Sequence, residues 1–124
     1  MTAADSSTLI AFFQGDVGRD VELLDNALLS AQLVLPPVIL TELLSDPGLG
    51  SDFADLVRAI PVLEIRLGFW ERVAETRARV LSKGLRARLA VSLIAQSCVD
   101  YETPLITRDT DFRHFATFAG LQLA

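Results

Sequence analysis

Cysteine, histidine and lysine are almost absent from this sequence, with one of each among 124 residues. The single cysteine, Cys98, excludes an internal disulfide and fits a reducing compartment, so we expect a cytoplasmic protein. Its apolar neighbours favour a buried small side chain over a nucleophile. The single histidine, His114, lies among phenylalanines, and we interpret it as a packed or surface residue rather than a catalytic one.

Long hydrophobic runs are also missing, although half of the residues are apolar and the mean hydropathy is +0.40. The longest candidate, Leu89 to Val99, is shorter than the roughly 20 residues that span a bilayer. The first residues, MTAADSS, lack the basic start and apolar centre of a signal peptide. We therefore expect no membrane partner and a single domain over residues 1–124. The high apolar content suggests elements buried on more than one face, or a surface covered by a partner.

Basic residues are scarce outside one segment. The net charge is −5, yet the stretch from Arg66 to Arg88 holds seven basic and only two acidic residues. An arginine stripe of this kind can follow the phosphates of a nucleic acid. A solvated helix face with Glu–Arg pairs explains the pattern equally well. The residues we assign to RNA binding under the first interpretation are Arg77, Arg79, Lys83 and Arg86.

Strand-like and helix-like segments alternate along the chain. Helices are expected over residues 7–13, 18–31, 37–46, 51–59, 68–84, 88–99 and 111–120. Strands are expected over residues 32–36, 60–65 and 104–107, with 121–124 as an edge strand. Residues 1–4 have weak strand propensity and are added because a parallel sheet needs an element before the first helix. The alternation predicts a three-layer α/β/α domain with a parallel sheet of about four to five strands.

Acidic residues follow two of these strands. Asp5 comes after the first strand and Asp109 after the strand 104–107, and the carboxyl ends of parallel strands meet at one edge. Glu42, on the helix 37–46, shares a face with Val38 and Ile39, so we expect it to be buried. A buried carboxylate needs a counterion, and no basic residue is near in sequence. A hard divalent cation such as Mg²⁺ answers that need.

Each acid also has a purely structural interpretation. Asp109 suits the cap of the helix that follows it, and Asp111 suits the positive end of the same helix. Asp5 suits a turn or the cap of the first helix. From the residues alone these alternatives stay open.

Three segments resemble the PIN-domain ribonucleases in order and spacing, and among them the small VapC-type toxins of bacterial toxin–antitoxin pairs. The segments are ADSSTLIAFF, PPVILTELL and SLIAQSCVDYETPLITRDTDF. The resemblance implies an acidic pocket that binds one or two Mg²⁺ or Mn²⁺ ions and cuts RNA. Carried over by motif, Asp5, Glu42 and Asp109 are the catalytic metal ligands and Asp111 is an accompanying acid. It also implies a homodimer with a groove for the C-terminal segment of a VapB-like antitoxin.

One position departs from the family pattern. The family has an aspartate two residues before the LIA triplet, as a principal metal ligand, and Val91 stands there in this chain. Valine binds no metal, so we expect weak metal binding and poor or absent cleavage. One explanation is natural degeneration to a binding-only domain. The other, which we favour because the surrounding motif is intact, is a deliberate inactivation or a selected escape from a toxic activity.

Three functions follow from these observations. The leading hypothesis is a Mg²⁺-dependent endoribonuclease in which the bound metal activates water for attack on a phosphodiester. The second is an inactive PIN scaffold that binds an antitoxin or RNA. The third, a phospho-accepting receiver domain, requires a lysine after its last strand, whereas Lys83 lies in the long helix. Apolar residues in or beside helices predict a protein interface: Phe12, Phe13, Phe53, Phe69 and Trp70.

Overall fold

A small parallel sheet lies at the centre of the molecule in the computed structural model, which describes all 124 residues. Its strands are β1 (Thr2–Ala4), β2 (Leu33–Val34) and β3 (Leu105–Ile106), in the order β2-β1-β3. All pairings are parallel. The α/β fold class is therefore as predicted, with fewer strands than the four to five expected.

The two missing strands are reduced to single bridges. Leu35 pairs with Val62 and Leu105 pairs with Leu123, both in parallel, at the two edges of the sheet. Pro61 has no backbone N–H to donate, which limits how far a strand can extend there. The predictions of strands over 60–65 and 121–124 are therefore wrong in extent, although both segments lie where a further strand would pair.

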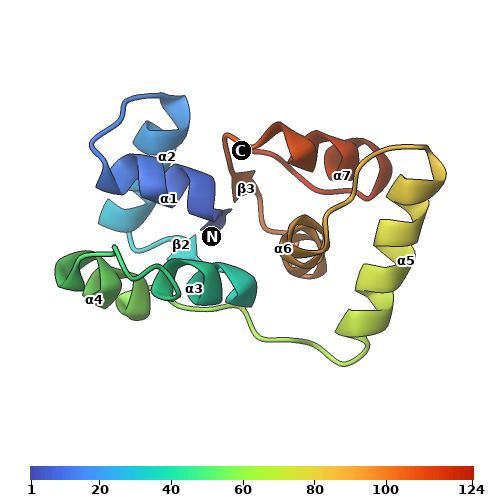
Figure 1. The fold of residues 1–124 in the computed structure, drawn as a ribbon, viewed down its shortest axis with the longest axis horizontal. Coiled ribbons are helices and arrows are strands. Elements are labelled where there is room, and N and C mark those ends of the chain that lie inside the picture. The colour runs from blue at the N-terminus through green and yellow to red at the C-terminus, as the bar shows by residue number, and fades with distance from the viewer.

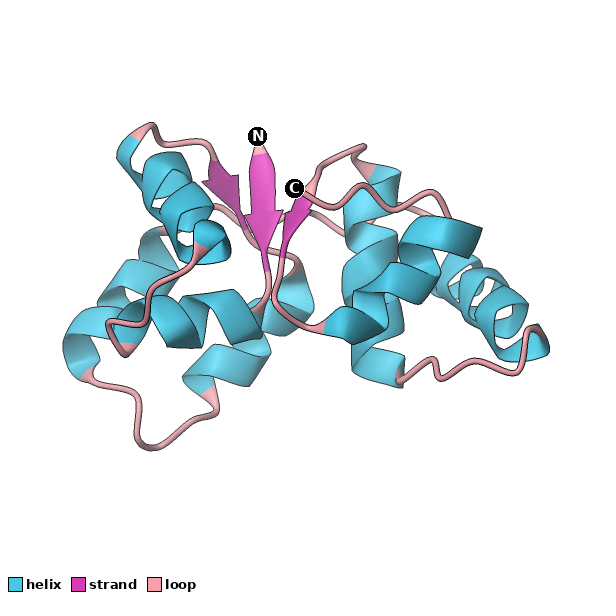
Figure 2. Cartoon of the chain, turned by 90° about the horizontal axis from the view of Figure 1, so that it is seen from above, coloured by secondary structure: helices cyan, strands magenta, loops and turns pink.

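Helices cover both faces of the sheet (Figures 1 and 2). On one side lie α1 (Ser6–Phe13), α2 (Arg19–Leu29), α3 (Pro37–Leu44) and α4 (Ser51–Ala59). On the other side lie α5 (Phe69–Ser82), α6 (Leu89–Asp100), the 3₁₀ helix η1 (Thr110–Phe112) and α7 (Arg113–Phe118). This is the three-layer arrangement expected from the alternation of elements. None of the helices combines the length and apolar character needed to cross a membrane.

β1 is the middle strand although its sequence has weak strand propensity. Ala3 and Ala4 are completely buried, and β1 pairs with a neighbour on each side. Helices pack against both faces of the sheet, so small side chains let the two layers approach this strand closely. Packing of the layers, rather than propensity, therefore accounts for its position.

Part of the high apolar content of the chain is buried in the core. Phe69 is buried, so its assignment to an interface is wrong. Phe12 and Phe13 are half-buried against the core, whereas Phe53 and Trp70 are exposed. The buried thiol Cys98 behaves as predicted, because burial raises its pKa to about 12 and keeps it protonated.

Candidate functional site

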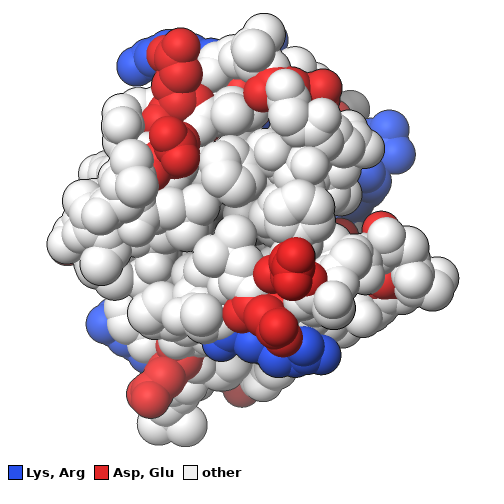
Figure 3. Space-filling view, turned by 90° about the vertical axis from the view of Figure 1, so that its left-hand side faces the viewer, with Lys and Arg blue, Asp and Glu red and all other residues white.

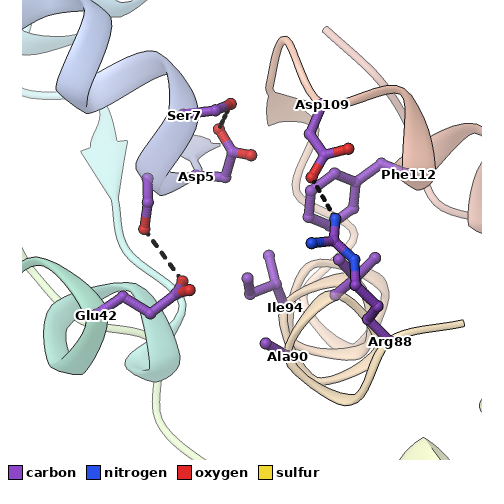
Figure 4. Close-up of a pocket in the computed structure, with 10 residues that line it drawn as sticks. Asp5, Ser7, Glu42, Arg88, Ala90, Ile94, Asp109 and Phe112 are labelled. Carbon is purple, nitrogen blue, oxygen red and sulfur yellow. Dashed lines mark hydrogen bonds and ion pairs between the residues drawn. The ribbon is translucent and has the colours of Figure 1, made fainter.

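A pocket of about 130 Å³ opens at the carboxyl ends of β1 and β3 (Figure 4). Segments far apart in the sequence form it: the start of α1, the helix α3, the N-terminal half of α6 with the residue before it, and the segment after β3. Its lining residues are Asp5, Ser6, Ser7, Glu42, Arg88, Ala90, Val91, Ile94, Asp109 and Phe112. The three acids predicted to be catalytic and the departing position 91 therefore share one pocket.

Asp5 is the N-cap of α1 and is only 4% exposed. One carboxylate oxygen accepts hydrogen bonds from the Ser7 hydroxyl at 2.7 Å and the Thr8 backbone N–H at 3.2 Å. The other accepts from the Thr107 hydroxyl at 2.6 Å. Burial raises the pKa of Asp5 above its ordinary value, with a smaller contribution from the charge of Asp109, although the three hydrogen bonds oppose the shift. Asp5 therefore both caps α1 and lines the pocket.

Glu42 is exposed, which corrects the expectation that it is buried among apolar side chains. The buried residues of α3 are Ile39 and Leu43, four positions apart, so the helix turns Glu42 toward solvent at the edge of the pocket. The Ser6 hydroxyl donates to Glu42 Oε1 at 3.1 Å. Because water solvates this carboxylate, burial gives no reason for a cation beside it.

Asp109 and Asp111 share a basic partner. Asp109 caps η1 by accepting the backbone N–H of Asp111 at 2.9 Å, as the structural interpretation predicted. Arg88 Nη2 lies 2.8 Å from Asp109 Oδ2 and 2.9 Å from Asp111 Oδ2. A guanidinium of this chain therefore bridges the two carboxylates.

Sequence reasoning missed this role of Arg88. Arg108, which directly precedes Asp109 in the sequence, does not pair with it, because its guanidinium pairs with Asp20 of α2 through bonds of 2.7 and 3.0 Å. A signal for Arg88 exists in the order of elements. Because α6 leads into β3, its C-terminal end lies at the amino edge of the sheet and its N-terminal end at the carboxyl edge. Arg88 immediately precedes α6, which places it beside Asp109.

Val91 belongs both to the pocket wall and to the hydrophobic core. It lies in the first turn of α6 and is 5% exposed. Ala90 and Ile94 also line the pocket, so α6 presents an apolar wall where the resemblance to PIN-domain ribonucleases predicts a metal-binding carboxylate.

The side chains present do not form a complete metal site. No three acidic, histidine or cysteine side chains lie close enough together to hold an ion. Both carboxylate oxygens of Asp5 already accept hydrogen bonds, and Asp109 forms an ion pair with Arg88. Magnesium or manganese binding by these residues therefore stays a prediction.

The basic stripe is partly used to hold the fold together. Arg77 and Arg79 each donate to a backbone carbonyl oxygen, at 2.7 and 3.1 Å. The Lys83 ammonium lies 5.6 Å from the centre of an aromatic ring of α7. The Arg86 guanidinium lies 3.9 Å from Asp111 Oδ2. RNA binding by these four residues stays a prediction.

The architecture and the position of the pocket define a PIN-like α/β/α fold. Among solved structures, the chain is similar to a chain of VapBC2 from Rickettsia felis, which was solved bound to a DNA fragment from the promoter of that pair. The TM-score is 0.75 at 16% identity, over 100% of this chain and 98% of that chain. No protein-family model matches the sequence, and no protein with a curated description matches it either. At this identity the likeness establishes the fold.

Proposed function

We propose that this chain is a VapC-like member of a toxin–antitoxin pair, built on an endoribonuclease scaffold whose active site is incomplete. The observation that carries the proposal is the convergence of Asp5, Glu42 and Asp109, from three separate segments, on one pocket. Val91 in the wall of that pocket is the reason to expect poor or absent RNA cleavage by the present chain. The complete form of such a site uses Mg²⁺ or Mn²⁺, and this chain lacks one expected ligand.

The proposed partners are RNA as substrate, a VapB-like antitoxin and a second copy of this chain, in the cytoplasm. The likeness to a chain of VapBC2, a toxin–antitoxin complex, supports the antitoxin. The exposed apolar side chains of Phe53 and Trp70 support a protein interface. The basic stripe, whose member Arg86 lies 3.9 Å from Asp111, supports contact with phosphates.

A second candidate is an inactive scaffold that binds an antitoxin or RNA without cutting. Two observations favour it: Val91 packs as a core residue, and Arg88 already pairs with Asp109. In that case the missing carboxylate is a settled feature of the protein rather than a lost part of an active site.

Restoring the carboxylate separates the two candidates. We expect Val91→Asp to gain Mg²⁺- or Mn²⁺-dependent cleavage of RNA, on the order of a hundredfold or more above the present chain. The same variant should become toxic when it is expressed without a partner. Cleavage is measured on single-stranded and structured RNAs, with and without a chelator.

The matched control adds Asp5→Asn to Val91→Asp and should abolish both cleavage and toxicity. If folded Val91→Asp protein cuts none of the RNAs with either ion, the ribonuclease proposal is wrong and the scaffold is supported.

A further inference from the structure

The pocket already holds a positive charge, and this chain supplies it. One guanidinium nitrogen of Arg88 lies within 3 Å of a carboxylate oxygen of both Asp109 and Asp111, at 2.8 and 2.9 Å. Figure 4 shows Arg88 reaching from α6 toward Asp109, on the side of the pocket opposite Glu42. Asp109 and Asp111 therefore have a counterion that the chain itself supplies.

The backbone places Arg88 at an otherwise unfavourable position for a cation. Arg88 is the N-cap of α6 in an extended conformation, with φ −59° and ψ 146°, and its side chain makes no cap hydrogen bond. The helix dipole disfavours positive charge at this end. Partial burial lowers the pKa of Arg88, but the charges of Asp109 and Asp111 outweigh that effect and the pKa is raised. The two acids are thus what holds the guanidinium there.

Because residue 91 is valine, α6 offers no acid that could pair with the Arg88 guanidinium in place of Asp109 and Asp111. Residues 88 and 91 are three apart, so they lie on neighbouring parts of the same end of α6. With valine at 91, the α6 side of the pocket carries no acid of its own. An ion that binds Asp109 Oδ2 must therefore displace Arg88 from that oxygen, and it gains no ligand from α6.

We propose that Arg88 is the resident cation of this pocket, occupying Asp109 and Asp111 in place of a divalent ion and competing with such an ion for Asp109. The inference concerns the same pocket as the proposed function but does not rest on RNA cleavage. The pocket of the present chain on this account contains an internal ion pair that weakens metal binding, rather than an empty metal site.

Arg88→Gln tests this directly, because glutamine removes the charge and keeps a polar side chain. Arg88 is nearly half exposed, so the variant should fold, as circular dichroism can verify. Mn²⁺ binding is measured without RNA, by paramagnetic resonance of the free ion and by calorimetry at constant ionic strength. We expect Arg88→Gln to bind Mn²⁺ roughly five- to tenfold more tightly than the present chain, since two partly exposed ion pairs are lost.

Arg86→Gln is the matched control. It removes the same charge at 3.9 Å from Asp111, yet Arg86 does not line the pocket. We expect it to change Mn²⁺ affinity less than about twofold. Adding Asp109→Asn to Arg88→Gln should cancel the gain, because the ion then loses the ligand that Arg88 released.

Three results would overturn the inference: unchanged affinity in Arg88→Gln, equal gains in the two arginine variants, or a gain that survives Asp109→Asn. Failure of Val91→Asp to cut RNA at saturating Mn²⁺, where the ion outcompetes Arg88 for Asp109, would count against the proposed function alone. The two proposals therefore fail separately.

Discussion

Val91 affects both the stability of the fold and the binding of metal ions, and its effects on the two are opposite. As a buried side chain it stabilises the packing of α6 against the sheet. As part of the pocket wall it occupies the position where a carboxylate would serve ion binding. A protein with aspartate at this position would have to bury a charge near Asp5, whose own ionisation burial already disfavours. Stability and metal binding are therefore linked at this residue.

Val91→Asp should be less stable than the present chain in the absence of metal, and metal should restore part of the loss. We expect a decrease in the free energy of unfolding of about 3 kcal/mol, the cost of a poorly compensated buried charge. Millimolar Mg²⁺ or Mn²⁺ should then raise its melting temperature by mass action, more than it raises that of the present chain. Thermal unfolding with and without each ion measures both effects.

Val73→Asp on α5 is the comparison, since Val73 is as buried as Val91 but does not line the pocket. It should lose stability without any rescue by metal. Equal metal-dependent shifts in the Val91→Asp protein and the present chain would mean that position 91 is not at an ion site.

At the scale of elements, hydrogen bonds within a polar cluster hold α5 against the C-terminal end of α6. The Asp100 carboxylate accepts two hydrogen bonds from Arg72, at 3.0 and 2.6 Å, and one from Gln96 at 2.9 Å. The Thr76 hydroxyl donates to Gln96 at 2.6 Å. Because α6 carries Arg88 and Val91 at its other end, this cluster sets the position of the helix that forms one wall of the pocket.

Asp100→Asn should destabilise the protein at neutral pH and not in strong acid. Burial raises the pKa of Asp100, but the hydrogen bonds from Arg72 and Gln96 and the nearby positive charges lower it below 3.8 overall. The folded state then binds the proton less readily than the unfolded state, so this stabilisation is present above pH 3.8 and is lost as pH falls through the lowered pKa. At pH 7 we expect a loss of about 2 kcal/mol, measured by urea unfolding.

The control for this prediction is Asp55→Asn, which breaks the exposed pair of Asp55 and Arg58 at 3.6 Å. Its effect should stay within about 0.5 kcal/mol at every pH. An Asp100→Asn protein that is as stable as the parent at pH 7 would contradict a fastening role for the cluster.

The surface of the whole molecule contains apolar area that the core does not use. Figure 3 shows a broad uncharged region, with acidic side chains around it, on the side formed by the first four helices. Phe53 on α4 stacks on Phe13 with ring centres 4.3 Å apart and stays exposed on its outer side. An apolar pocket of about 340 Å³ lies between α2, β2 and α4. Trp70 and Leu67 form a separate exposed group before and at the start of α5.

The exposed Phe53 and the apolar pocket beside α4 lead us to expect a homodimer at tens of micromolar. Light scattering should give twice the chain mass of 13.5 kDa. Phe53→Glu should weaken the dimer by about tenfold or more, because it places a charge within the contact area. Trp70→Glu, at the separate exposed group, should leave it intact. A monomeric parent protein, or dissociation by Trp70→Glu alone, would contradict this choice of surface.

Much of the fold follows from local sequence pattern. The helix over 51–59 is found with the predicted bounds, and those over 68–84 and 88–99 are found within two residues of them. Caps, prolines and apolar periodicity act within a few residues, so they can be recognised without the fold. Strand length is different, because a strand ends where its neighbour stops pairing. The segment 60–65 therefore needed the position of β2 before its single bridge could be known.

By itself the sequence determined the alternation of elements, the edge at which Asp5 and Asp109 meet, and the presence of valine rather than an acid at position 91. These depend on chain order and residue identity, and a parallel sheet brings its carboxyl ends to one edge whatever the packing. Only the tertiary structure decided that Glu42 faces solvent and that Arg88, not Arg108, pairs with Asp109. Both outcomes depend on how each helix is rotated against the sheet and on partners about 20 or more residues away, which no local pattern records.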